Sequence, residues 1–268
     1  MTALEARSGQ AHLKGEVTGR GRTVVFLHAG VADRRMWRAQ ASALAERCQV
    51  VTYDRRGFGE TRPVDEDYSH VRDLLAVLDA AGADRATLVG CSQGGKIALD
   101  FTLAHSDRVE GLVLVAPSIG GVPATETFPA PVEALLEELE AAEASGDLDR
   151  LNRMEARVWL DGVLGEEGRV SGEVRELFLD MNGIALRGAE VGQEEPAPPA
   201  WPRLGKITVP AWAICGDLDF PHLQERCASL GEVLPGTRSL VLEGTAHLPS
   251  LEQPGAFNTL LLPLLPTL

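Results

Sequence analysis

Residues 88–95 read Leu88-Val89-Gly90-Cys91-Ser92-Gln93-Gly94-Gly95, so that a Gly-x-Ser-x-Gly motif joins an apolar run to a helical stretch. A serine at such a strand-to-helix turn has a strained backbone and an exposed hydroxyl, and the flanking glycines avoid collisions across the turn. The positive end of the following helix lies where negative charge would develop on a substrate oxygen. The motif predicts that Ser92 is a nucleophile. The alternative is a glycine-rich β–α turn without a catalytic role.

Short apolar runs recur on both sides of this turn. They are continuous rather than alternating, which is typical of strands buried on both faces, and helical stretches such as 71–78 and 96–103 separate them. The expected strands are 23–27, 50–53, 87–89, 112–115, 211–215 and 239–242, with 12–17 as an antiparallel edge strand. The pattern predicts an α/β fold with a mostly parallel central sheet and helices on both faces.

The pattern changes between residues 118 and 203, where no strand is predicted. Helices are expected at 132–144, 148–160 and 173–181, and the segment ends in the proline-rich stretch 193–202, which favours a stiff, non-helical return. We therefore predict a helical lid at 118–203, inserted into a core formed by residues 1–117 and 204–268.

Charge is distributed unevenly along the chain. The 268 residues have a formal net charge of -14, and residues 121–200 alone contain 18 acidic and 6 basic residues. A basic nucleic-acid-binding protein is excluded, because neutralising phosphates requires excess cations. The acidic lid has either a solvated outer face or a field that disfavours anions at the entrance of the site. A small-molecule substrate is thus expected to be neutral rather than anionic.

The remaining composition predicts a cytoplasmic protein without membrane association. The N-terminus lacks the apolar core of a signal peptide, and no apolar run approaches the ~20 residues that span a bilayer. The four cysteines, at positions 48, 91, 215 and 227, lack metal-ligand spacing and are expected to be reduced core residues. The sequence leaves open whether the chain forms a homo-oligomer.

A serine nucleophile needs a base, usually a histidine oriented by a carboxylate. His247 lies on a loop of small residues just after a predicted strand, where its ring can reach the carboxyl edge of the sheet. His222, which begins a helix soon after two acidic residues, is the rival. Asp219 is the favoured carboxylate because it lies further out on the loop after strand 211–215 than Asp217 does, and Asp217 is the alternative.

The order Ser92, Asp219, His247 is that of α/β-hydrolases, and the chain resembles the lid-bearing serine hydrolases of that superfamily. Three further segments are similar to family motifs: 27–30 to the His-Gly-x loop, 53–59 to the Asp-x-Arg-Gly-x-Gly turn, and 244–254 to the histidine loop. The resemblance covers roughly residues 22–117 and 204–268. It implies that His28 and residues 54–56 have structural roles.

The resemblance also implies an oxyanion hole made of the backbone N–H groups of Gln93 and Gly30. Ala29 stands where the family usually has glycine, which leaves Val31 as an alternative to Gly30. No metal or organic cofactor is implied. The expected reaction is hydrolysis of a small carboxylic ester or lactone through an acyl-enzyme. The alternatives are hydrolysis of a C–C bond in a diketone or ring-cleavage product, and a small-molecule receptor without turnover.

Overall fold

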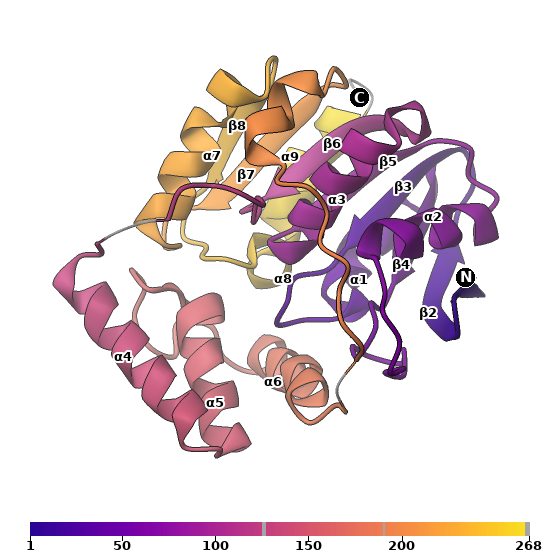
Figure 1. Cartoon of the computed structure of the whole chain (residues 1–268). Coiled ribbons are helices and arrows are strands. Elements are labelled where there is room, and N and C mark those ends of the chain that lie inside the picture. The colour runs from indigo at the N-terminus through magenta and orange to yellow at the C-terminus, as the bar shows by residue number, and fades with distance from the viewer. Residues whose placement is uncertain (125–126, 190, 266–268) are drawn as a thin grey trace.

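The computed structural model describes residues 1–124, 127–189 and 191–265 and contains one sheet in the order β1-β2-β4-β3-β5-β6-β7-β8 (Figure 1). The strands are β1 (Thr2–Ser8), β2 (Ala11–Thr18), β3 (Arg22–Leu27), β4 (Cys48–Tyr53), β5 (Ala86–Cys91), β6 (Val109–Val115), β7 (Ala211–Gly216) and β8 (Arg238–Leu242). The pairs β1–β2 and β2–β4 are antiparallel, and all other neighbouring strands are parallel. The predicted α/β class and its six parallel strands are confirmed.

The N-terminal hairpin differs from the expectation. The segment predicted as an edge strand forms β2, which is antiparallel but interior, because β1 pairs with its outer side. The prediction of an edge position was therefore wrong. β1 gives little signal in the sequence, since only Leu4 and Ala6 of its seven residues are buried and neither is β-branched.

Alternating side chains of the strands fill two cores, one on each face of the sheet. Val25 and Leu27 face the helices α2 (His70–Ala80), α3 (Gln93–Ala104) and α7 (Pro221–Val233). Val24 and Phe26 face the layer formed by α1 (Arg38–Leu44), α8 (Pro249–Glu252) and α9 (Pro254–Leu264). Continuous apolar runs are required because both faces are covered.

The strand order reverses at β3. From β3 the chain passes through the short 3-10 helix η1 (Arg34–Trp37) and α1 to β4, whereas β5 pairs with the other side of β3 and continues into α3. Since α1 and α3 cover opposite faces, the loops after β3 and β5 diverge. Such a switch point opens a crevice at the carboxyl ends of the strands, which is where α/β folds bind ligands.

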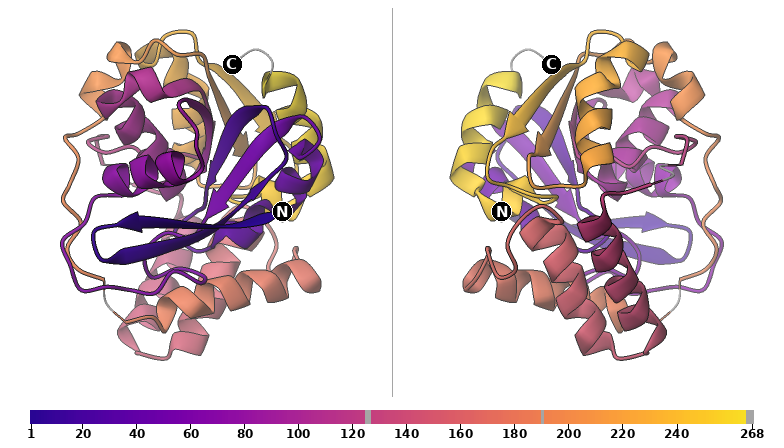
Figure 2. Two further views of the ribbon diagram at one scale, coloured as in Figure 1. Left: turned by 90° about the vertical axis from the view of Figure 1, so that its right-hand side faces the viewer. Right: turned by 90° about the vertical axis from the view of Figure 1, so that its left-hand side faces the viewer.

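The chain between β6 and β7 forms helices α4 (Ala130–Ala144), α5 (Leu148–Glu155), η3 (Ala156–Gly162) and α6 (Glu173–Leu186). These helices gather at one end of the sheet in both views of Figure 2. The predicted helix 148–160 is α5 followed by the π-helical turn η3. The Leu164 N–H donates to the Leu218 carbonyl just beyond β7, which places this helical insertion at the carboxyl ends of the strands.

The two ends of the insertion lie side by side. The Trp201 N–H donates to the Gly120 carbonyl at 2.9 Å. The 3-10 helix η4 (Trp201–Lys206) spans position 203, the predicted end of the lid, and buries Leu204 in the core. Within the described part of the chain, no helix has the length and apolar character needed to cross a bilayer.

Packing of α9 against the sheet gives a first prediction. Phe257 is fully buried and its ring lies 6.1 Å from that of Trp37. Phe257→Ala should lower the free energy of unfolding in urea by about 3–5 kcal/mol, because it removes apolar contacts and leaves a cavity. Thr259→Ala, on the exposed side of the same helix, should change it by less than about 0.5 kcal/mol. Equal losses for the two variants would contradict this account of the packing.

Candidate active site

Ser92 lies between β5 and α3 in a conformation that few residues with a side chain adopt. Its φ is 52° and its ψ is -114°, and α3 begins at the next residue. The Ser92 N–H donates to the Val115 carbonyl at 2.8 Å, which fixes the turn against β6. Backbone strain of this kind costs about 1–3 kcal/mol and persists only where surrounding structure enforces it. The turn leaves Ser92 partly exposed at the carboxyl edge of the sheet.

The glycines of the motif allow the first turn of α3 to approach the end of β3. A Cβ atom on Gly94 would collide with the Leu27 carbonyl, and one on Gly90 would collide with the Gly94 carbonyl. Only hydrogen fits at these positions, so the spacing of the motif has a steric cause. The start of α3 therefore lies directly beside the loop that follows β3.

His247 and Asp219 come from the loops after β8 and β7 and meet in a buried pair. The His247 Nδ1 atom lies 2.8 Å from Asp219 Oδ2, and the two side chains are 3% and 1% exposed. The other oxygen of Asp219 accepts the Phe220 N–H at 2.8 Å. With Nδ1 donating to the carboxylate, Nε2 is the ring nitrogen free to accept a proton.

Asp217, the alternative carboxylate, is engaged elsewhere. Its Oδ1 accepts the backbone N–H of Gly244 at 2.6 Å, so it joins the loops after β7 and β8. The rival histidine, His222, packs against Phe128 and Phe220 with ring centroids 5.2 and 5.4 Å away. No described carboxylate accepts a hydrogen bond from His222, and burial lowers the pKa of its ring.

The serine turn and the histidine loop are in direct contact. The Cys91 thiol, one residue before Ser92, lies 3.5 Å from the His247 carbonyl oxygen and donates to it. The ring of Trp159, from η3 of the insertion, lies 4.7 Å from the His247 ring. The Ser92 hydroxyl makes no hydrogen bond to another described residue. The structure thus brings Ser92, His247 and Asp219 to one edge of the sheet, beneath the insertion.

Gln93 and Gly30, the expected oxyanion-hole residues, lie side by side across the switch point. A Cβ atom on Gly30 would be 3.2 Å from Gln93 Oε1. Neither backbone N–H donates to another described residue. Ala29, which replaces the expected glycine, is fully buried, and its N–H points to the Met36 sulfur at 3.5 Å. Two backbone N–H groups without an acceptor among the described residues thus lie near the turn that holds Ser92.

Glu252 lies within the histidine-loop motif, although its sequence context does not indicate a role at the site. Its fully buried carboxylate accepts the N–H groups of Ala246 at 2.8 Å and Leu248 at 2.9 Å, the two residues that flank His247. Arg169, from the insertion, forms an ion pair with this carboxylate and also donates to the Gly244 carbonyl. Burial raises the pKa of Glu252, while Arg169 and the backbone donors oppose that shift. The histidine loop is therefore held from the insertion.

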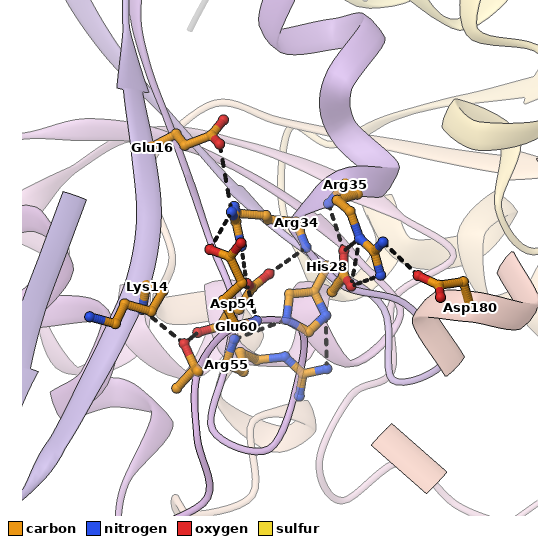
Figure 3. Close-up of polar contacts among 11 residues, drawn as sticks. Lys14, Glu16, His28, Arg34, Arg35, Asp54, Arg55, Glu60 and Asp180 are labelled. Atoms are coloured by element: carbon orange, nitrogen blue, oxygen red, sulfur yellow. Dashed lines mark hydrogen bonds and ion pairs between the residues drawn. The ribbon is translucent and has the colours of Figure 1, made fainter. Parts of the chain in front are cut away.

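A second polar network supports the loop after β3 (Figure 3). Arg34 bonds to Asp54 and Glu60, while Arg35 binds Asp33 and reaches Asp180 of α6 at 2.6 Å. Burial raises the pKa of Asp54 to about 6. Through Arg35 and Asp180, the loop that carries Gly30 is tied to the insertion. No group of three or more described His, Cys, Asp or Glu residues is arranged to hold a metal ion.

Glu252 gives a prediction for the histidine loop. In Glu252→Gln the amide nitrogen cannot accept a backbone N–H, and Arg169 loses its charged partner, so the free energy of unfolding should fall by about 1–3 kcal/mol. Glu243→Gln, the same substitution at an exposed position nearby, should leave it unchanged. Chemical denaturation measures both. Equal stability of the two variants would show that the buried carboxylate does not hold the loop.

Comparisons with known proteins agree with this architecture. The model of the Alpha/beta hydrolase family matches residues 24–260. A provisionally named carbamate hydrolase, RutD of Azorhizobium caulinodans, is 38% identical over 117 residues, a match that covers 41% of this chain and only 43% of that protein. The 2-hydroxy-6-oxo-6-phenylhexa-2,4-dienoate hydrolase of Burkholderia cepacia is 28% identical over 91% of this chain and 87% of its own.

Among solved structures, a thermophilic esterase from Thermogutta terrifontis superposes with a TM-score of 0.74. It is 24% identical, and the superposition covers 99% of this chain and 98% of the esterase. Such a likeness concerns the fold, whereas the family match extends from β3 to α9 and spans most of the chain. The chain belongs to the alpha/beta hydrolase family.

Proposed function

We propose that this hydrolase is a serine enzyme that acts through an acyl-enzyme without a cofactor. The observation that carries the proposal is the buried Asp219–His247 pair, 2.8 Å apart, in contact with the strained turn that presents Ser92. A buried carboxylate hydrogen-bonded to an imidazole fixes the tautomer that can take a proton from a nearby hydroxyl. Membership of the hydrolase family supports the same reaction class.

In the proposed reaction, Ser92 Oγ attacks the substrate carbonyl carbon while His247 Nε2 takes the hydroxyl proton. The carbonyl electron pair moves to oxygen, which the N–H groups of Gly30 and Gln93 bind. Collapse of the tetrahedral intermediate expels the leaving group, and His247 returns the proton to it. Water, activated by the same imidazole, then cleaves the acyl-enzyme. Asp219 stabilises the imidazolium formed in each half-reaction.

For the substrate, we propose a small carboxylic ester or lactone without negative charge, bound beneath a lid formed by residues 118–203. The aromatic ring of Trp159 against His247 supports an apolar neighbourhood for the acyl or alcohol group. The carboxylates of Glu133, Glu137, Glu138, Glu140 and Glu143 on α4 are exposed. This placement favours the solvated-face explanation of the acidic charge, although a repulsive field on anions follows from the same residues.

Hydrolysis of a C–C bond is the second candidate. It is favoured by the likeness to the Burkholderia cepacia dienoate hydrolase, which extends over 91% of this chain. Both reactions would use the same serine turn, histidine and aspartate, so substrate trials must separate them.

The proposed mechanism predicts covalent labelling at Ser92. A fluorophosphonate probe should label the wild type and not Ser92→Ala, with mass spectrometry identifying the modified peptide.

Asp219→Asn should lower kcat for a short-chain nitrophenyl ester by roughly 10⁴-fold, because the wrong histidine tautomer is favoured. The kcat of Asp217→Asn, two residues away, should stay within about tenfold of the wild-type value, because this variant weakens only the hydrogen bond to the Gly244 N–H. A wild type that is neither labelled nor active would overturn the proposal.

The substrate proposal predicts that neutral esters are hydrolysed faster than esters bearing a carboxylate. The ratio of kcat/KM for nitrophenyl acetate and nitrophenyl hemisuccinate should exceed one at low salt and fall as salt screens the lid. Equal kcat/KM values for the two esters at low salt would show that the acidic residues of the lid do not repel anionic substrates.

Parallel assays with γ-lactones and 1,3-diketones distinguish the two reaction classes. Turnover of the diketones alone would replace the ester proposal with C–C hydrolysis.

A further inference from the structure

Arg55 is a buried cation that forms no ion pair with a carboxylate of the described residues. Two described arginines are fully buried, Arg55 at 1% and Arg56 at 3% exposure. Arg56 pairs with Asp73 at 2.9 Å and with Glu66 at 2.7 Å. No carboxylate oxygen of a described residue lies within 4.0 Å of the Arg55 guanidinium. Burying an unpaired charge is costly, so the contacts that Arg55 makes instead need an explanation.

Those contacts join the two loops that carry the proposed oxyanion donors. Arg55 Nη1 donates to Gln93 Oε1 at 2.6 Å, and Nη2 donates to the Ala29 carbonyl at 2.9 Å. The Ala29 carbonyl belongs to the same planar peptide group as the Gly30 N–H. A hydrogen bond to that carbonyl fixes the orientation of the group and polarises its N–H, which strengthens it as a donor.

Neighbouring residues hold the guanidinium in place. It lies 4.4 Å from the centroid of the Phe58 ring, a cation–π arrangement. The backbone N–H of Arg55 donates to His28 Nε2 at 3.0 Å, and His28 Nδ1 in turn lies 2.8 Å from the Ala29 carbonyl oxygen and donates to it. Figure 3 shows His28 joined to Arg55 by dashed lines. The Ala29 carbonyl therefore accepts two hydrogen bonds, one from Arg55 and one from His28.

We propose that Arg55 is a positioning residue that ties the two halves of the oxyanion hole together, through the Ala29 carbonyl on one loop and the Gln93 side chain on the other. The inference rests on the proposed serine mechanism, because it assigns the Gly30 and Gln93 N–H groups to the oxyanion. This role goes beyond the structural one that the resemblance implied for Arg55 in the turn after β4. Burial lowers the pKa of Arg55 to about 10, so the guanidinium is charged at neutral pH.

The test compares Arg55→Met with Arg56→Met. Both remove a buried guanidinium of similar exposure, but Arg56 touches neither oxyanion loop. Arg55→Met should lower kcat for a nitrophenyl ester by about 10- to 100-fold with KM little changed, since the lost interaction acts in the transition state. Arg56→Met should lower the melting temperature yet keep kcat per folded enzyme. Equal kcat losses in the two variants would overturn the inference.

A second readout is insensitive to the amount of folded protein. A trifluoromethyl ketone adds to Ser92 as its hydroxyl proton passes to His247, and the resulting oxyanion occupies the hole. Its inhibition constant should rise in Arg55→Met by the same factor as kcat falls. The inhibition constant of the matching methyl ketone, which binds without a stable adduct, should not change. Parallel weakening of both ketones would indicate a general loss of binding and contradict the proposal.

Gln93→Met provides a variant that keeps Arg55 and the backbone N–H but removes the amide acceptor. If Arg55 acts partly through this acceptor, the double variant should lose less than the product of the two single losses. Multiplicative losses would show that Arg55 and Gln93 act independently, and would overturn the tie between the loops. Fluorophosphonate labelling of the wild type separates the two proposals: without labelling the serine mechanism fails, whereas labelling with unimpaired Arg55→Met refutes only the role of Arg55.

Discussion

The close approach of α3 to the end of β3 is the constraint on which the whole site depends. At Gly94 only a hydrogen atom fits against the Leu27 carbonyl, and at Ser92 the backbone adopts φ 52° to turn from strand to helix. Because β3 is also the switch point of the sheet, this approach places the Gln93 N–H opposite the loop that carries Gly30. Strain at one residue thus sets the geometry of the proposed nucleophile, Ser92, and of both candidate oxyanion donors.

The sheet was predictable because its strands are buried on both faces and their apolar runs are unbroken. The edge was not: Thr2–Ser8 has few β-forming residues and is a strand because β2 offers it hydrogen bonds. The helix α9 was also missed, since its leucines surround Pro263, which the structure accommodates close to the helical end. Local composition predicts strands and helices that bury many apolar side chains. It fails for elements such as β1, which form because an adjacent element provides hydrogen bonds or packing contacts.

The residues predicted for the site follow strands, so the topology alone brings Ser92, Asp219 and His247 to one edge. Their supports could not be found in this way. Arg169 and Glu252 lie far apart in the sequence. The sequence around Arg55 does not indicate that its guanidinium is buried without an ion pair to any described carboxylate. Such partners are set by packing between segments, which no periodicity records. The role of a buried charged residue can be inferred only when the residues that contact it are known.

The helical insertion between β6 and β7 is joined to the core in two ways, which have opposite effects on how easily another segment could replace it. Its two ends leave the core at adjacent points, where the Trp201 N–H donates to the Gly120 carbonyl. A different helical segment could therefore replace it with little change in the backbone of the core. Its interior, however, supplies Arg169 to a carboxylate that is fully buried beside the histidine loop. A chimera that exchanged this helical segment without an equivalent cation would leave the buried Glu252 carboxylate without its ion-pair partner. An exchange of the helical insertion in this chain must therefore preserve a cation at the place of Arg169, or change Glu252 at the same time.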